Sequence, residues 1–458
     1  MKTITPQPSK TAGTPNAKTG GIFHALIALS VKLVERWLPD PYVLVLLLTL
    51  AVFGAGVIVE GQSPASMIQY WGDGFWGLLV FAMQMILVLV TGYTLARTPL
   101  FRRILQGMAC LANTPRQAII LVSLVSLAAA WINWGFGLVV GALFARQLAR
   151  KVKGIHYPLL IASAYTGYLV WHGGISGAVP LFLASKGAFG TNEIIPIAET
   201  VFSGFNLFIV LALVVIVPIL NGTMVGKPED AVVVTDVQLS EDDQALPLVF
   251  TRPADRLNNS LVLSLLTGLA GIVFLLYYFF GRGGIFDFNS LIFLFLILSI
   301  ILHGRPSFFL HHVNEAMKGA GGIAIQFPFY AGLMGMIVGS GLGATLSNFF
   351  VSISNATTFP LFTFLSAGLL NIFIPSGGGQ WAVQGPIMLD AGATLGVETA
   401  RTAMAVAWGD AWTNMIQPFW ALPALAIAGL SAKDIMGYCL IVLFVSGAII
   451  GAGLVFIP

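Results

Sequence analysis

Residues 117–150 of the chain read QAIILVSLVSLAAAWINWGFGLVVGALFARQLAR and decide the fold. Two apolar arms flank the irregular centre NWGFG at residues 133–137, and arginines stand near both outer ends. A segment that starts and finishes on the same side of a bilayer does not cross it, so we interpret this one as a re-entrant hairpin. Irregular backbone within a membrane is tolerated only where protein or a water-lined cavity satisfies its polar groups. The tip of the hairpin therefore predicts a cavity.

The composition of the whole chain is that of a membrane protein. Hydrophobic residues make up 57% and charged residues 9% of the 458 residues, whereas a soluble domain carries ~25% charged residues. Cys110 and Cys439 are the two cysteines, too few for a disulfide scaffold. The net charge of +3 is too small to indicate a nucleic-acid partner. We expect an all-α polytopic protein whose partner is the lipid bilayer.

Nine further segments are long and apolar enough to cross a bilayer, which takes ~20 mostly apolar residues. They are residues 42–59, 75–96, 157–184, 200–220, 258–280, 286–302, 319–339, 400–428 and 434–457. Arginine and lysine clusters at residues 97–116 and 146–153 mark the cytoplasmic side. This places the N-terminus in the cytoplasm and the C-terminus in the periplasm.

The chain divides into two halves of similar design. Residues 360–395 resemble the first hairpin, with PSGGGQ at the tip, and an offset of 243 residues aligns Pro180 with Pro423. We predict a disordered tail at residues 1–21, repeats at 22–222 and 258–458, and a hydrophilic cytoplasmic linker at 223–257. The extra crossing at 258–280 inverts the second repeat. Inverted repeats with broken helices are the architecture of secondary transporters, although a receptor with accidental self-similarity is the alternative.

Two of the long spans carry breaks. One break lies at His172-Gly173-Gly174, and the other runs from Asn414 to Pro418. Pro418 removes a backbone donor, so we expect the carbonyls before it to be available to a cation or water. The alternative is a packing kink, which glycine and proline often produce in membrane helices.

Asp410 is the acidic side chain deepest within a full span. Helical spacing places Thr413, Asn414 and Gln417 on its face, and an ionisable residue in a membrane helix indicates a functional site. Desolvation favours the protonated form of a carboxylate, so Asp410 can carry a proton, while Na⁺ is the other candidate ion. The alternative is an aspartate hydrogen-bonded for packing. For His172 a proton relay is possible, but we favour a structural hydrogen bond.

No lysine or arginine lies at a hairpin tip or in the middle of a span. An anionic substrate would therefore be held by amide dipoles at helix N-termini, such as those after Gly137 and Gly379. That arrangement suits one carboxylate better than two. Trp134, Phe136 and Trp381 would wall an apolar pocket for an acyl chain, or equally would face lipid.

The candidate residues form two sets. The expected substrate-binding residues are Asn133, Gly135, Gly137, Gly173, Gly174, Ser176, Ser376, Gly377, Gly378, Gly379, Gln380, Trp381, Asn414 and Gln417, with Gln84 and Gln326 at equivalent mid-span positions. The expected ion-coupling residues are Asp410 and Thr413. We expect no cofactor, and Na⁺ at Asp410 is the one metal ion under consideration.

Six motifs resemble the bacterial short-chain fatty acid transporter family, the AtoE-type permeases. They are WLPDP at 37–41, WGDGFW at 71–76, INWGFG at 132–137, QFPFY at 326–330, PSGGG at 375–379 and NMIQPFW at 414–420. The resemblance implies uptake of monocarboxylates such as acetoacetate and butyrate across the inner membrane. It also implies an ion-transporter superfamily whose carriers use an elevator motion, often as dimers. His172 stands where we expect glycine in this family.

The function predicted from the sequence is an H⁺ or Na⁺ symporter of short-chain monocarboxylates. A cation-coupled C4-dicarboxylate carrier of the same fold is the first alternative, weakened by the lack of interior cations. An intramembrane hydrolase using Ser176, His172 and Asp410 is a distant one, because the sequence shows no pairing of nucleophile and base. A channel is also conceivable.

Overall fold

The computed structural model describes residues 22–37, 39, 41–184, 194–234, 250–284, 288–318, 320–374 and 377–458. This part of the chain is mostly helical and contains no β-strand, as the all-α prediction requires. The predicted tail at 1–21 and residues 235–249 of the linker lie outside the described residues.

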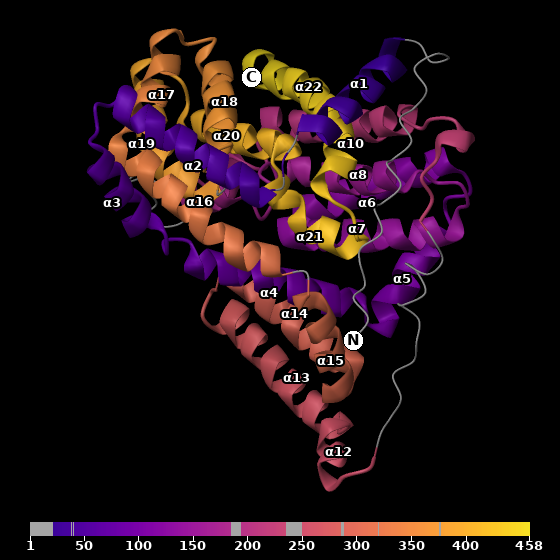
Figure 1. Cartoon of the computed structure of the whole chain (residues 1–458). Helices are drawn as coiled ribbons and strands as arrows, with labels where there is room; N and C mark the ends of the chain where they lie inside the picture. Colours follow the sequence, from indigo (N-terminus) through magenta and orange to yellow (C-terminus); the bar gives the residue numbers. More distant parts are fainter. Residues whose placement is uncertain are drawn as a thin grey trace.

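Ten α-helices make up the first half (Figure 1). They are α1 (Ile22–Trp37), α2 (Pro41–Ile58), α3 (Pro64–Gly74), α4 (Leu79–Ala96), α5 (Pro99–Ala109), α6 (Pro115–Ile132), α7 (Trp134–Lys151), α8 (Tyr157–Thr166), α9 (Ala178–Leu183) and α10 (Gly204–Thr223). A 3₁₀ turn at Gly167–Val170 prolongs α8 before its break.

The second half runs from α12 to α22. Its helices are α12 (Pro253–Asn258), α13 (Leu261–Leu276), α14 (Phe288–His303), α15 (Pro306–Met317), α16 (Gly321–Ser340), α17 (Leu342–Ser352), α18 (Phe359–Asn371), α19 (Gly377–Thr394), α20 (Thr399–Thr413), α21 (Pro418–Ala428) and α22 (Ala432–Phe456). A 3₁₀ turn at Asn414–Ile416 separates α20 from α21.

The helices α2–α10 and α14–α22 follow the same order of long, short and broken elements. Packing between the halves is reciprocal, because α4 contacts α14 and α15 while α16 contacts α2 and α3. The two predicted hairpins are α6–α7 and α18–α19, whose arms pack side by side. This order agrees with two repeats, and their inverted orientation in a membrane stays a prediction.

Four short helices were missed by the search for long apolar spans: α3, α5, α15 and α17. The sequence does carry a signal for two of them. Ser63 and Thr98 accept hydrogen bonds from the first turns of α3 and α5, each followed directly by proline. A serine or threonine N-cap before proline at the first helical position is a common helix start. The span predicted at 75–96 is also shorter, because α4 begins at Leu79.

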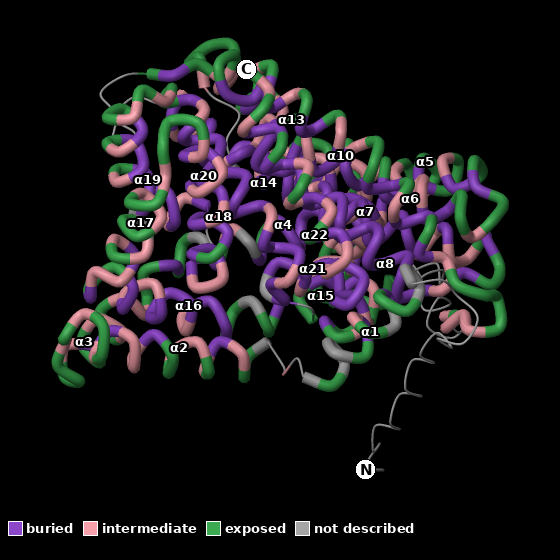
Figure 2. Tube along the Cα trace, turned by 90° about the horizontal axis from the view of Figure 1, so that it is seen from above, coloured by how far each residue is buried: buried purple, intermediate pink, exposed green. Residues whose placement is uncertain are grey.

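Among the described residues, four helical segments are individually long and apolar enough to cross a membrane: α6, α10, the stretch Leu261–Gly281 and α22. A fifth candidate is the pair Ala324–Ser340 and Leu342–Ser352, bent by 72°. Since α6 passes this test, length does not distinguish a hairpin arm from a crossing. Figure 2 shows buried residues concentrated around α7, α8, α21 and α22, with exposed residues along the outer helices. The interior of this helical core contains the candidate site.

Candidate functional site

The first hairpin turns at Asn133, as predicted. The Asn133 side chain caps α7 by accepting a hydrogen bond from the amide of Phe136 at 3.0 Å. Gly137 packs on the backbone of Ala130, where an added Cβ would lie 2.5 Å from the Ala130 Cα. Glycine therefore allows the two arms to meet closely just past the tip.

The break after α8 lies against this first tip. The amide of Trp134 donates to the hydroxyl oxygen of Ser176 at 3.0 Å, and the amide of Ile175 donates to the carbonyl of Trp131 at 2.9 Å. The carbonyl of Gly173 accepts from the Trp131 indole at 3.1 Å. Hydrogen bonds to the hairpin tip and to side chains thus replace the helical hydrogen bonds that are lost at the break.

The second hairpin is held together by amide side chains. Gln380 donates to the carbonyl of Ala367 at 2.8 Å, and Gln384 donates to the hydroxyl of Ser366 at 2.9 Å. Gln380 therefore binds the opposite arm, which differs from its predicted place in the substrate site. Ser376 lies outside the described residues.

A polar cluster joins the end of α18 to the break in α20. The side-chain amide of Asn371 donates to the carbonyl of Asp410 and to the side-chain oxygens of Thr413 and Asn414, at 2.8–2.9 Å. Gln417 donates to the carbonyl of Asn371 at 3.0 Å. Sequence reasoning missed Asn371, which ends a hairpin arm and carries no charge. Gln417 reaches the cluster although α20 ends at Thr413, so helical spacing does not explain its position.

The carbonyl before the second break is not available in the way predicted. Pro418 cannot donate to the carbonyl of Asn414, but the hydroxyl of Tyr165 does so at 2.6 Å. The amide of Gln417 also approaches that carbonyl at 3.2 Å. The prediction of a carbonyl waiting for a cation is therefore wrong at Asn414, because a tyrosine from the first half replaces the missing donor.

Asp410 and His172 lie together between the two breaks. The Nδ1 atom of His172 is 3.0 Å from Oδ2 of Asp410, and both side chains are buried, at 0% and 1% exposure. Nδ1–H is directed at the carbonyl of Ala407, 2.9 Å away, which supports the structural hydrogen bond favoured for His172. Sequence reasoning treated the two residues separately, although each sits beside a predicted break.

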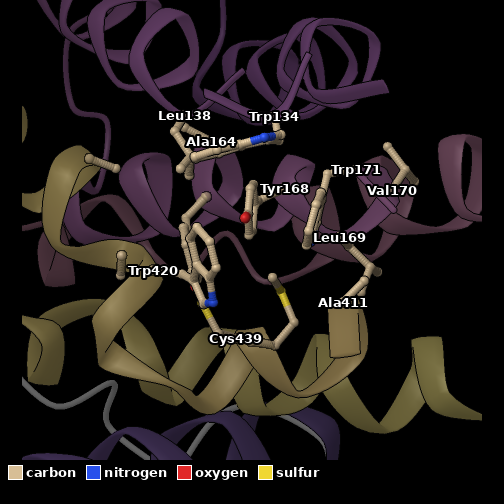
Figure 3. Close-up of a cluster of buried hydrophobic side chains, with 14 of the residues drawn as sticks. Trp134, Leu138, Ala164, Tyr168, Leu169, Val170, Trp171, Ala411, Trp420 and Cys439 are labelled. Carbon is tan, nitrogen blue, oxygen red and sulfur yellow. The ribbon is translucent and has the colours of Figure 1, made fainter. Parts of the chain in front are cut away.

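Aromatic rings from both halves gather in the core (Figure 3), and one of them, Trp171, stacks on His172 with ring centroids 3.7 Å apart. The ring of Tyr168 lies beside both Trp171 and Trp420, at centroid distances of 5.6 and 5.4 Å. Trp134 from the first tip is 5.5 Å from Trp420 and 6.1 Å from Trp171. We call these four rings, Trp134, Tyr168, Trp171 and Trp420, the aromatic cluster. It contains Trp134 as expected, together with three aromatics that the sequence did not single out for the site.

The second tip reaches the same place from the other side. A Cβ added to Gly377 would lie 2.6 Å from Cε1 of His172 and 3.2 Å from the Trp171 ring. Gly378 lies against Phe182 of α9. The two hairpins therefore both approach the Trp171–His172 segment, and a binding site there stays a prediction.

Several predicted residues have other contacts. Gln84 donates to Asn289 of α14 at 2.8 Å, and Phe136 packs against Phe101 and Phe295 rather than the aromatic cluster. Gln326 is buried on α16, and its carbonyl oxygen has no hydrogen-bond partner among the described residues. Trp381 is buried against Gly385 of its own helix.

No group of three potential metal ligands among histidine, cysteine and carboxylate side chains occurs in the described part of the chain. Two cavities, of about 300 and 590 Å³, lie away from the tips, beside His156 and beside Asp390 respectively. At the junction of tips and breaks, the side chains of Asp410 and His172 are buried.

These features define an all-α polytopic membrane protein whose buried polar groups converge where two helical hairpins meet two broken helices. The chain belongs to the short chain fatty acid transporter family, whose sequence profile matches residues 22–457. It is 45% identical over 428 residues to an Escherichia coli K12 protein provisionally named a short-chain fatty acid transporter, covering 92% of this chain and 97% of that relative.

Two other proteins are similar. A Haemophilus influenzae protein with the same provisional name is 40% identical over 436 residues, covering 93% of this chain and 97% of its own length. Among solved structures, the YdaH transporter of Alcanivorax borkumensis matches with a TM-score of 0.45 and 15% identity, covering 91% of this chain and 97% of that chain.

Proposed function

We propose that the protein is a secondary active transporter that takes up short-chain monocarboxylates, such as acetoacetate and butyrate, by cation symport. The observation that carries this proposal is the meeting of both hairpin tips and both breaks around Trp171, His172 and Asp410. Family membership supports the substrate class, because the family and the relatives are named for short-chain fatty acids.

The junction offers both parts of a small-acid site. The aromatic cluster presents apolar surface suited to a short acyl chain. Beside it, the side-chain nitrogen of Asn414 is buried and has no hydrogen-bond partner among the described residues. A carboxylate would satisfy this donor, and the positive end of the α19 dipole would favour its negative charge. A site built on neutral donors suits one carboxylate, which favours monocarboxylates over C4-dicarboxylates.

Asp410 is the proposed ion-coupling residue, with Thr413 beside it. Buried carboxyl oxygens of Asp410 and side-chain oxygens of Asn371 and Gln417 lack hydrogen-bond partners within the described residues. Such oxygens can accept a proton or contribute to a Na⁺ shell. We propose in addition the bacterial inner membrane as location, a cytoplasmic N-terminus, a periplasmic C-terminus, and an elevator motion within a dimer.

The hydrolase alternative has its histidine–carboxylate pair, since His172 and Asp410 lie 3.0 Å apart, but Ser176 and His172 each have other hydrogen-bond partners. The hydroxyl of Ser176 accepts from Trp134, and Nε2 of His172 accepts from the amide of Val179 at 3.4 Å. A nucleophile and its base would need to share a hydrogen bond.

Counterflow in proteoliposomes tests the transport proposal. Vesicles loaded with unlabelled butyrate should take up labelled butyrate transiently above equilibrium, and external acetoacetate should compete whereas succinate should not. Protein-free vesicles measure passive entry of the protonated acid. Absence of protein-dependent counterflow would contradict the proposal, and strong inhibition by succinate would favour the dicarboxylate carrier.

A further inference from the structure

We infer that His172 and Asp410 together form the binding site of the transported proton, so that the carrier is a proton symporter in which His172 is a coupling residue. This inference rests on the proposed function and adds the identity of the coupling ion. It is carried by the geometry of the pair, its charge and its contact with the second tip.

The hydrogen bonds of His172 define its charge. Nδ1 donates to the carbonyl of Ala407, and Nε2 accepts from the amide of Val179. An imidazole with one donor and one acceptor nitrogen is neutral. With an ionised Asp410, the pair then carries one negative charge and has room for one more proton, since Oδ1 accepts no hydrogen bond from the described residues.

A buried negative charge of this kind calls for a cation. Leaving one charge of a buried pair uncompensated costs several kcal/mol, and both side chains here are almost fully buried. The nearest basic residue along α20 is Arg401, which donates to the carbonyls of Leu454 and Ile457 at 2.9 and 2.8 Å. One added proton brings the pair to neutrality, either as a carboxylic acid or as an imidazolium–carboxylate pair.

The neighbouring side chains stabilise the proton on the pair and do not compete with the pair for it. Asp410 interacts electrostatically with Tyr168, which interacts with Tyr165, and Tyr165 in turn with Cys439. Tyrosine and cysteine side chains are ordinarily neutral at pH 7. Trp171 stacks on the imidazole of His172, with centroids 3.7 Å apart and planes 15° apart. A stacked indole stabilises a cationic ring through its π face, so the proton can move to His172.

His172 also argues against Na⁺ at this carboxylate. A sodium ion is bound by oxygen atoms, whereas Oδ2 of Asp410 faces the protonated Nδ1 nitrogen at 3.0 Å. A proton needs no such shell, because one acceptor lone pair is enough.

Contact with the second tip links the proton to the substrate. Gly377 begins α19 and lies against the His172 ring, so the helix N-terminus expected to bind the substrate carboxylate adjoins the pair. A negative pair repels that carboxylate, and a neutral pair does not. The proton therefore binds first, and one proton accompanies one monocarboxylate without net charge movement.

Imposed gradients in proteoliposomes test the inference with the wild-type chain, His172→Gln and Asp410→Asn. An inward pH gradient should drive accumulation of labelled butyrate by the wild type, and a Na⁺ gradient should not. Both variants should lose pH-driven accumulation down to the protein-free level. Asp410→Asn should retain butyrate counterflow, because its neutral side chain imitates the protonated state. Purified wild type should take up one proton per bound butyrate, measured with a pH indicator in weak buffer.

Matched controls and stability checks complete the design. Asp390→Asn and His311→Gln make the same changes at exposed positions and should behave as wild type. His172→Gln leaves a lone buried carboxylate, so the double variant with Asp410→Asn, which also removes the carboxylate charge, should fold and exchange if the single variant does not. Full pH-driven accumulation by either single variant, or accumulation driven by Na⁺ alone, would overturn the inference while leaving transport standing. Failure of wild-type counterflow would overturn the proposed function instead.

Discussion

The hydroxyl of Tyr165 donates to the carbonyl of Asn414 at 2.6 Å, across 249 positions of the chain. In a continuous helix the backbone amide of residue 418 would donate a hydrogen bond to this carbonyl, but residue 418 is proline and has no amide hydrogen. Tyr165 comes from α8 and is fully buried. One broken helix therefore completes the hydrogen bonding of the other, so the two breaks are structurally coupled.

Removing this hydroxyl should destabilise the protein. In Tyr165→Phe the only remaining donor to the buried carbonyl of Asn414 is the more distant amide of Gln417. A buried acceptor that lacks a good hydrogen bond lowers the free energy of unfolding by about 1–3 kcal/mol. We expect a lower thermal unfolding midpoint in detergent and slower butyrate counterflow. Tyr70→Phe on α3 is the matched control. An unchanged midpoint in Tyr165→Phe would show that Tyr165 does not support the break.

Much of the fold can be predicted from the lengths of the apolar segments alone. Helices occupy every predicted span, and the hairpins at 117–150 and 360–395 correspond to α6–α7 and α18–α19 within two residues at each outer end. The short helices were missed because α3 and α5 are amphipathic or interrupted by glycine, so a search for apolar runs passes over them. Their Ser-Pro and Thr-Pro starts were the available signal.

The site was only partly predictable, because contacts between distant segments decide it. Trp134 and Asp410 stand out in the sequence by residue type and position. Asn371 does not, because it belongs to the site only through its hydrogen bonds to three acceptors on α20 and the turn after it. His172 was set aside as structural, since the sequence does not show that the break beside it adjoins Asp410. Gln84 and Gln380 show the opposite case, because the sequence predicted them in the site. Side-chain amides have many possible partners, and these two donate to neighbouring helices instead.

A side chain at Gly377 should disturb the contact between the second tip and His172. The Cβ of Gly377→Ala would lie 2.6 Å from Cε1 and 2.9 Å from Nε2 of His172. Overpacking of this kind costs about 1–3 kcal/mol, and here it separates α19 from the proposed proton site. We expect strongly reduced butyrate counterflow with normal membrane insertion.

Gly72→Ala is the matched control for Gly377→Ala, since no atom lies within 4 Å of its added Cβ. It should transport as wild type. Equal counterflow rates in the two variants would mean that the second tip moves away from His172 without consequence for transport.

The aromatic cluster should set the accepted chain length. Trp420 is 1% exposed and contacts the other three rings of the cluster. Trp420→Leu enlarges the apolar space, so longer acids should compete better for butyrate counterflow. Each buried methylene contributes ~0.8 kcal/mol, which corresponds to about a fourfold gain in inhibition per added carbon.

Competition by acetate, butyrate and hexanoate measures this selectivity. The control is Trp76→Ala, because Trp76 is 62% exposed and lies outside the aromatic cluster. Parallel loss of affinity for all three acids in Trp420→Leu, without a shift toward hexanoate, would remove the cluster from chain-length selection.

The connection before α8 should make stability depend on acidity. Burial lowers the pKa of His156 from 6.5 to about 4, although Asp230 acts to raise it. The amide of Val232 donates to Nδ1 of His156 at 3.0 Å, and Tyr438 contacts Nε2 at 2.8 Å. The ring is therefore neutral in the fold, while the unfolded chain binds a proton below pH ~6.5. Stability should be constant above that pH and fall as the pH drops towards 4, by at most ~1.4 kcal/mol per unit from this group.

Thermal unfolding midpoints test this dependence. They are measured for detergent-purified wild type and His156→Gln at pH 7.5, 6.5, 5.5 and 4.5, a range chosen around the ordinary histidine pKa of ~6.5. The glutamine is neutral throughout, so the variant should lose less stability between pH 6.5 and 4.5 than the wild type. His312, whose pKa burial also lowers, to about 3, contributes a decline of the same sign to both proteins. The informative quantity is therefore the difference between their slopes. Parallel curves would mean that His156 does not contribute to the dependence of stability on pH.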